Sequence, residues 1–138
     1  MIKPEYLLSM KIKGLLLILP VILVSFFAHA QTVKKLDVQN FEKKLKETKS
    51  PTLVDVRTQD EYTQGHLANA LLIDIYSRDF KSQVSKLDKA KPVFVYCKAG
   101  SRSSSAVDIL SDLGFREIYD LNGGIIAWQR VNKPIVKK

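Results

Sequence analysis

The sequence predicts a single α/β domain, because short apolar runs alternate along it with stretches in which apolar residues recur at helical spacing. The clearest strand is 92–96, whose core Val93-Phe94-Val95-Tyr96 has no polar break and suits the buried middle of a parallel sheet. The clearest helix is 103–113, where Ala106, Leu110 and Leu113 share a face. The 138 residues, 46% of them apolar and 26% charged, suffice for one domain and exclude a disordered or multi-span membrane chain.

The other predicted elements follow the same two patterns. Asp37 can cap a helix whose apolar residues Val38, Phe41 and Leu45 lie on one face. A short helix with Glu61 and Tyr62 ends at Gly65. Strands are predicted at 52–56, 70–75 and 117–121, a helix at 77–87, and a last helix after Gly123-Gly124 whose Trp128 packs in the core.

An apolar segment near the N-terminus predicts a secretory signal peptide. Leu15 to Phe27 is almost wholly apolar, follows two lysines and precedes the small-x-small triplet Ala28-His29-Ala30. It is shorter than the ~20 residues of a spanning helix, and Pro20 lies near its middle. We therefore expect cleavage after Ala30, a domain over 31–138 and an exported protein, periplasmic or extracellular, with no stable membrane insertion. An uncleaved anchor is the alternative, and Met10 is an alternative start that gives a more compact signal.

Charge and cysteine content exclude several classes of site. The formal charge is +8, and loss of residues 1–30 removes three lysines and one glutamate, which leaves +6. Because the lysine-rich stretches at 43–49 and 133–138 have no interleaved aromatic residues, they indicate a solvated surface and no nucleic-acid partner. The one cysteine, Cys97, and the two histidines exclude an internal disulfide and a Cys-based zinc cage.

The chemistry is expected at Cys97, which directly follows the most apolar strand and precedes a helix. The intervening small residues Ala99, Gly100 and Ser101 let the backbone curl so that its N–H groups converge on an anion. The helix N-terminus adds its dipole, and Lys98 and Arg102 add positive charge. Such a cradle favours the thiolate, which is a nucleophile without a general base. The alternative is a buried core cysteine at a strand end.

Several stretches of the sequence are similar, in order, to the successive motifs of single-domain rhodaneses, the sulfurtransferase family. They span nearly all of the chain after the signal, and they are Leu53-Val54-Asp55-Val56-Arg57, Glu61-Tyr62-Thr63-Gln64-Gly65-His66-Leu67, Cys97-Lys98-Ala99-Gly100-Ser101-Arg102-Ser103, Gly114-Phe115, and Leu121-Asn122-Gly123-Gly124 with Trp128. One departure is Ala68-Asn69, where the family often has Pro-Gly; it affects a turn.

The resemblance implies the rhodanese-like fold, an open, mostly parallel five-stranded sheet with helices on both faces. It implies a persulfide on Cys97, a substrate cradle formed by Lys98, Ala99, Gly100, Ser101 and Arg102, and no metal or organic cofactor. The expected partners are a small anionic sulfur donor such as thiosulfate and a thiol, cyanide or protein acceptor, with the protein a monomer.

The remaining polar residues of these motifs have two interpretations each. Asp55 and Arg57 end a strand at the same sheet edge as Cys97, so they either line the pocket or, as we favour, form a charge network that holds the loops. His66 follows a turn glycine and is expected to bond backbone rather than act as a base.

Two other functions stay open at this stage. A cysteine phosphatase or arsenate reductase also uses a thiolate in an anion-binding loop. The resemblance to the phosphatase family would imply five residues between the cysteine and the arginine of that loop, whereas only four separate Cys97 from Arg102 here. No aspartate is clearly placed as a general acid, although Asp74 or Asp79 could in principle serve. The other alternative is a non-enzymatic persulfide carrier or regulatory binding module.

Overall fold

The computed structural model describes residues 30–137. The predicted signal peptide, apart from Ala30, and the alternative start at Met10 lie outside the described residues. Within the described range, no helix combines the length and the apolar character needed to cross a membrane.

The fold is built on one open sheet of five strands, all of them parallel to their neighbours. The spatial order is β1-β5-β4-β2-β3, so β4 lies in the middle. The strands are β1 (Thr32–Leu36), β2 (Thr52–Asp55), β3 (Leu71–Leu72), β4 (Val93–Tyr96) and β5 (Glu117–Leu121). The α/β class with a parallel sheet is thereby confirmed.

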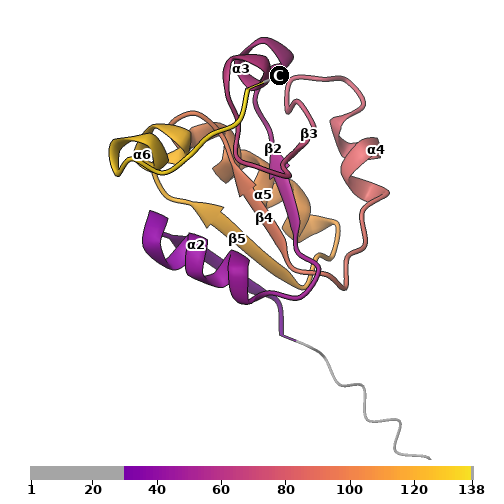
Figure 1. The fold of residues 1–138 in the computed structure, drawn as a ribbon. Helices are drawn as coiled ribbons and strands as arrows, with labels where there is room; N and C mark the ends of the chain where they lie inside the picture. Colours follow the sequence, from indigo (N-terminus) through magenta and orange to yellow (C-terminus); the bar gives the residue numbers. More distant parts are fainter. Residues whose placement is uncertain (1–29, 138) are drawn as a thin grey trace, which may run out of the picture.

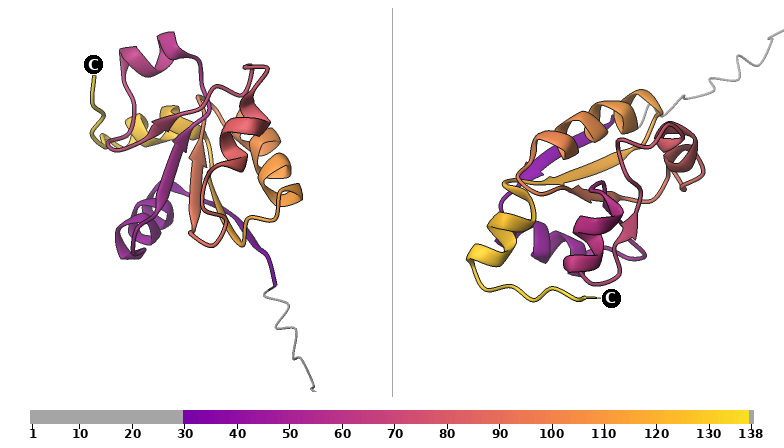
Figure 2. Two further views of the ribbon diagram at one scale, coloured as in Figure 1. Left: turned by 90° about the vertical axis from the view of Figure 1, so that its right-hand side faces the viewer. Right: turned by 90° about the horizontal axis from the view of Figure 1, so that it is seen from above.

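Helices cover both faces of the sheet, as the right-hand view of Figure 2 shows, with α4 and α5 on one side and α2, α3 and α6 on the other. Their bounds are α2 (Val38–Glu47), α3 (Gln59–Gln64), α4 (Phe80–Ser85), α5 (Ser101–Asp112) and α6 (Gly124–Arg130). Asp37 caps α2 as predicted, because its side chain accepts a hydrogen bond from the Asn40 N–H. Figure 1 places the last residues beside α3.

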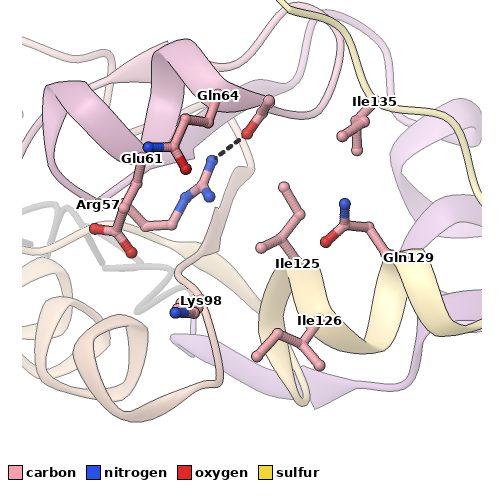
Figure 3. A pocket seen from close by; sticks show the side chains of 9 residues that line it. Arg57, Glu61, Gln64, Lys98, Ile125, Ile126, Gln129 and Ile135 are labelled. Atoms are coloured by element: carbon pink, nitrogen blue, oxygen red, sulfur yellow. Dashed lines mark hydrogen bonds between the residues drawn. The ribbon is translucent and has the colours of Figure 1, made fainter.

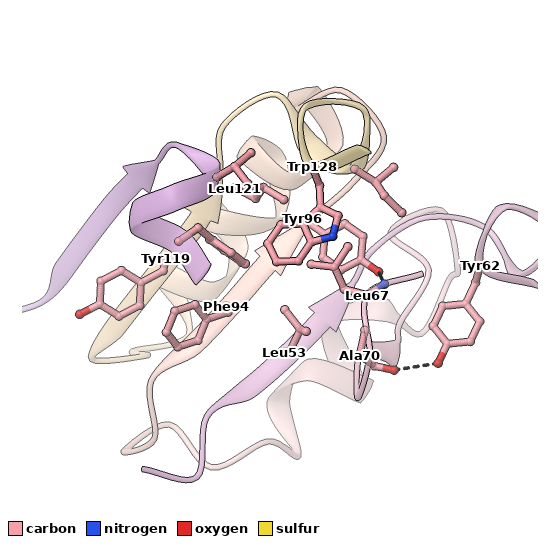
Figure 4. Close-up of a cluster of buried hydrophobic side chains, with 12 residues drawn as sticks. Leu53, Tyr62, Leu67, Ala70, Phe94, Tyr96, Tyr119, Leu121 and Trp128 are labelled. Carbon is pink, nitrogen blue, oxygen red and sulfur yellow. Dashed lines mark hydrogen bonds between the residues drawn. The ribbon is translucent and has the colours of Figure 1, made fainter. Parts of the chain in front are cut away.

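Two hydrophobic clusters stabilise the layers, because successive strand residues point to opposite faces. Phe94 and Tyr96 of β4 face α2, α3 and α6, where Trp128 also packs as expected (Figure 4). Val93 and Val95 face α4 and α5. Cys97 belongs to this second cluster, so the site begins inside the core layer beneath α5.

Three predicted elements were wrong in extent. Only the short edge strand β3 forms within the predicted strand 70–75, and α4 is shorter than the predicted helix 77–87. The predicted helix 103–113 begins two residues earlier, at Ser101. The last shift has a local cause: Gly100 is the N-cap residue with φ of 114°, and the chain enters helical geometry as soon as this glycine has made the turn.

Strand β1 was not predicted, and only the family resemblance called for a fifth strand. Its middle residues Val33, Lys34 and Lys35 are exposed, so no apolar pattern marks them. The strand forms because all five of its residues pair in register with β5, a partner about 85 residues away in the chain that local sequence does not reveal.

The departure at Ala68-Asn69 is accommodated without change to the fold. Asn69 has φ of 65°, in the left-handed region that Asn tolerates better than most residues. Asparagine therefore makes the turn for which the family often uses glycine.

Candidate functional site

Cys97 lies where β4 ends, at the carboxyl edge of the sheet. The residue is 1% exposed, and its Sγ accepts a hydrogen bond from the Gly100 N–H at 3.0 Å. The thiol also contacts the Ser103 Oγ at 3.5 Å, and that hydroxyl donates to the Gly100 carbonyl at 3.1 Å. Cys97 is thus buried like a core cysteine, and its sulfur also faces a backbone donor in a curled loop, so its reactivity stays a prediction.

The loop from Lys98 to Gly100 is shorter than the predicted cradle. Its turn depends on the positive φ of Gly100, a conformation that a β-branched residue resists. Ser101 and Arg102 belong to the first turn of α5 rather than to the loop. Of the expected cradle amides, Gly100 alone donates to Sγ within the part of the chain that the structure describes.

Helix α6 holds the loop from the other side. The Ile125 N–H donates to the Cys97 carbonyl at 2.9 Å, and the Ile126 N–H donates to the Lys98 carbonyl at 3.1 Å. Gly124 makes this approach possible, because a Cβ at this position would lie 2.4 Å from the Lys98 carbonyl oxygen. The first free N–H groups of one helix thus satisfy the carbonyls of the Cys97 loop.

Arg102 is committed to an ion pair. Its Nη1 and Nη2 each donate to one carboxylate oxygen of Glu61 at 2.7 Å, and Glu61 also completes a capping box with Thr58 at the start of α3. The Arg102 hydrogen bonds lower the pKa of Glu61 to about 2. Arg102 therefore ties α5 to α3, and its positive charge is largely compensated.

Lys98 is the uncompensated cation of the predicted set. Its side chain is exposed, and it has no ion pair within residues 30–137. Because an exposed ammonium is screened by water and salt, Lys98 can attract an anion toward the loop but adds little to the affinity of the loop for that anion.

Asp55 and Arg57 form the predicted charge network, and Arg57 also lines a pocket beside the loop. Arg57 is 4% exposed and makes bonds of 2.9 and 2.7 Å to the two Asp55 oxygens, while its Nη2 also donates to the Gly65 carbonyl. Burial opposes the charged form of Arg57, but the Asp55 hydrogen bonds outweigh it and raise the Arg57 pKa. The Tyr96 hydroxyl donates to Asp55. The same hydroxyl accepts from the Leu67 N–H (Figure 4), and the two bonds fix the β2–α3 segment.

A pocket of about 210 Å³ lies beside the loop. Figure 3 shows Lys98 and Arg57 on one side of it and Ile125 and Gln129 of α6 on the other, with Ile135 at the top. Cys97 does not line this pocket; the Cys97 side chain is on the opposite side of the backbone, under α5. The pocket therefore borders the loop without opening directly onto the sulfur.

His66 has a structural role, as expected. Its Nδ1 bonds the Tyr62 carbonyl at 2.9 Å, and its backbone forms a two-way bridge with Val136 at 2.9 Å each way. The bridge holds the C-terminal segment against α3. Among residues 30–137, no group of three or more His, Cys, Asp or Glu side chains is placed to bind a metal ion.

Three features of the site escaped the sequence analysis. Glu61 was assigned only to a helix, although its position three residues after Thr58 is a capping-box signal. The role of Gly123-Gly124 in approaching the loop was not inferred, and neither was the burial of the Asp120 carboxylate on β5. A charged residue in an otherwise apolar strand is the signal that could have identified Asp120.

Comparison with known proteins finds proteins named sulfurtransferases and a rhodanese-related structure among those similar to this chain. The chain is 35% identical over 104 residues to a protein named sulfurtransferase from Allochromatium vinosum, covering 75% of this chain and 95% of that one. It is 43% identical over 77 residues to thiosulfate sulfurtransferase GlpE of Coxiella burnetii, covering 56% of this chain and 70% of that one. The crystal structure of a rhodanese-related protein from Thermoplasma volcanium superposes with a TM-score of 0.67 at 30% identity, covering 76% and 99% of the two chains.

The family model described as a rhodanese-like domain matches residues 37–131, from the cap of α2 to the end of α6. This range contains β4, the Cys97 loop and the α6 start that anchors it. The chain belongs to the rhodanese-like domain family.

Proposed function

We propose that the protein is a sulfurtransferase that moves sulfane sulfur from thiosulfate, or a similar small anionic donor, to a thiophilic acceptor through a persulfide on Cys97. One observation carries the proposal: the Cys97 Sγ accepts the Gly100 N–H at 3.0 Å, in a loop that α6 and α5 hold from both sides. A thiolate and a terminal persulfide sulfur are both anions, and a preorganised N–H donor stabilises each of them.

The proposed reaction has two displacement steps. The Cys97 thiolate attacks the outer sulfur of thiosulfate, an S–S bond forms on Cys97, and sulfite leaves with the electron pair of the broken bond. The acceptor then attacks the terminal sulfur and releases the thiolate. This is covalent catalysis with a good leaving group, so neither step requires a proton donor. The 1% exposure of Cys97 supports a small donor rather than a bulky one.

The mass of the intact protein tests this function, because Cys97 is the one cysteine of the chain. Incubation with thiosulfate should add the mass of one sulfur atom, and cyanide should then remove it as thiocyanate. Cys97→Ser should stay folded, because a hydroxyl can use the same Gly100 and Ser103 contacts, and it should gain no mass. Loading with negligible turnover to any small acceptor would indicate a persulfide carrier, and phosphatase turnover without added sulfur would indicate a phosphatase.

We also propose that the chain is exported with cleavage after Ala30. The support is the sequence pattern of residues 11–30. The expected mature N-terminus is Gln31. Sequencing that finds Met1 or Met10 on a membrane-bound protein would instead indicate an anchor.

A further inference from the structure

The Cys97 thiol contacts the Ser103 hydroxyl inside the core layer under α5. Ser103 is fully buried on the first turn of that helix, and the Cys97 Sγ and the Ser103 Oγ are 3.5 Å apart. Three hydrogen bonds form a closed ring: the Gly100 N–H donates to Sγ, the thiol donates to the Ser103 Oγ, and the hydroxyl donates to the Gly100 carbonyl. Loss of the thiol proton removes the second of these bonds and leaves the lone pairs of Sγ and Oγ facing each other, so the ring must rearrange.

The Ser103 hydroxyl has two acceptors within reach. The Gly100 carbonyl oxygen is 3.1 Å from Oγ, and the larger Cys97 sulfur is 3.5 Å from it. A hydroxyl hydrogen rotates about the C–O bond and can point to either acceptor. The Gly100 carbonyl does not depend on Ser103 alone, because it also accepts the Ser104 N–H at 3.2 Å. The hydroxyl can therefore turn to the sulfur without leaving a buried carbonyl unpaired.

A thiolate in this layer is the stronger of the two acceptors. Hydrogen bonds to an ionised group are about twice as strong as those between neutral groups. Cys97 is 1% exposed and Ser103 is fully buried, so little water competes for the sulfur. The hydroxyl therefore favours the Gly100 carbonyl while Cys97 is protonated and favours the sulfur once Cys97 is ionised.

We propose that Ser103 is a catalytic residue whose hydroxyl turns from the Gly100 carbonyl to the Cys97 sulfur when the thiol ionises. This inference rests on Cys97 being the nucleophile of sulfur transfer. The S–H bond breaks, its electron pair stays on the sulfur and its proton passes to solvent, while the Ser103 O–H bond stays intact and changes only its direction. The thiolate then accepts the Gly100 N–H and the Ser103 O–H. The same two donors stabilise the thiolate as it leaves in the second displacement step.

The charged groups around the thiol differ from the hydroxyl in their contacts. On α5, Arg102 is paired with Glu61, and Lys98 in the loop is exposed. On β5, neither oxygen of the buried Asp120 has a hydrogen-bond partner among residues 30–137. Strand β2 and helix α4 contribute apolar side chains to the cluster around the sulfur. Removal of the hydroxyl changes none of these charges, so a shift in thiol ionisation on its removal belongs to the hydroxyl.

The pH profile of Cys97 alkylation by iodoacetamide tests this role, because the reagent reacts with the thiolate and needs no sulfur donor. In Ser103→Ala the midpoint should move upward by about one pH unit, so that alkylation is about tenfold slower below the midpoint. Above both midpoints the variant should react at least as fast as wild type, because a more basic thiolate is the stronger nucleophile. The ultraviolet absorbance of the thiolate, read against Cys97→Ser, follows the same titration and does not require the reagent to reach the sulfur.

Thermal unfolding verifies the fold of Ser103→Ala, and Ser103→Gly removes the same hydroxyl if the alanine variant does not fold. Ser105→Ala is the matched control, because Ser105 is exposed on the same helix and its hydroxyl donates to the Ser101 carbonyl. Its profile should equal that of wild type. The shift caused by Ser103→Ala should persist in an Asp120→Asn background, because no hydrogen bond joins the described Ser103 hydroxyl to the Asp120 carboxylate.

An unshifted or lowered midpoint in Ser103→Ala overturns the proposal. Equal slowing of alkylation at every pH does so too, since it indicates a disturbed loop rather than the loss of a hydrogen bond to the thiolate. Loss of the shift in the Asp120→Asn background shows that the hydroxyl acts through the carboxyl and likewise overturns the proposal. A protein that shows the shift but never gains sulfur from thiosulfate contradicts the proposed function alone, and one that gains sulfur without the shift contradicts the role of Ser103 alone.

Discussion

The ion pair between Glu61 and Arg102 should make the stability of the protein depend on pH in acid. Its two parallel 2.7 Å bonds join α3 to the first turn of α5, next to the Cys97 loop. Glu61→Gln keeps the shape of the side chain and an oxygen for the Thr58 N–H, but removes the charge. The variant therefore isolates the electrostatic part of the link between the two helices.

The size of the effect follows from the depression of the Glu61 pKa. The Arg102 hydrogen bonds lower it from its usual 4.5 to about 2, which for a fully buried pair corresponds to about 3 kcal/mol. A quarter of the Glu61 side chain is exposed, so solvent screening reduces the expected loss on Glu61→Gln to about 1–2 kcal/mol at neutral pH. A group with a lowered folded-state pKa stabilises above its usual pKa and loses that contribution as the pH falls.

Urea unfolding between neutral pH and about pH 2 measures this difference. Wild type and Glu61→Gln should differ by the full amount above pH 4.5 and converge as the pH falls to about 2, where Glu61 itself becomes protonated. Asp60→Asn is the control, because it removes a charge from the same turn of α3 at an exposed position. A difference that persists unchanged at the acid end, or an equal loss in Asp60→Asn, would refute the assignment of this stability to the ion pair.

Three further substitutions probe the loop. Lys98→Ala should raise the KM for thiosulfate by no more than about fivefold, or about 1 kcal/mol, and steady-state assays should show the effect fading with added salt; persistence in high salt would contradict a screened charge. Gly100→Val should slow both the alkylation of Cys97 and its loading with sulfur, because valine resists φ of 114°. If Gly100→Val keeps the wild-type pH profile of alkylation while Lys98→Ala shifts it strongly, side-chain charge rather than the backbone activates the thiol. Gly124→Ala should destabilise the protein by about 2 kcal/mol or more, because its Cβ would overlap the Lys98 carbonyl. Gly114→Ala, where φ is 87° but no atom lies within 4 Å, should cost only about 1 kcal/mol in the same thermal unfolding assay.

The sequence by itself determined the α/β class, the central strand and the placement of Cys97 at its end. These features depend on local signals: an unbroken apolar run for β4, helical spacing of Ala106 and Leu110 in α5, and a glycine where the loop turns. The motif order also predicted the family. Local pattern was sufficient because a strand buried on both faces, such as β4, must be apolar throughout.

Tertiary structure alone decided the electrostatics of the site and which residues form the fifth strand. Arg102 looked like a free cation beside the cysteine until the fold placed Glu61, 41 residues earlier, against it. Strand β1 and the position of Asp120 beneath α5 likewise depend on pairing with distant segments. The physical reason is the same in each case. The free energy of a charge depends on the opposite charge or hydrogen bonds near it in space, and that of an edge strand depends on the strand it pairs with; spacing along the sequence does not encode either neighbour.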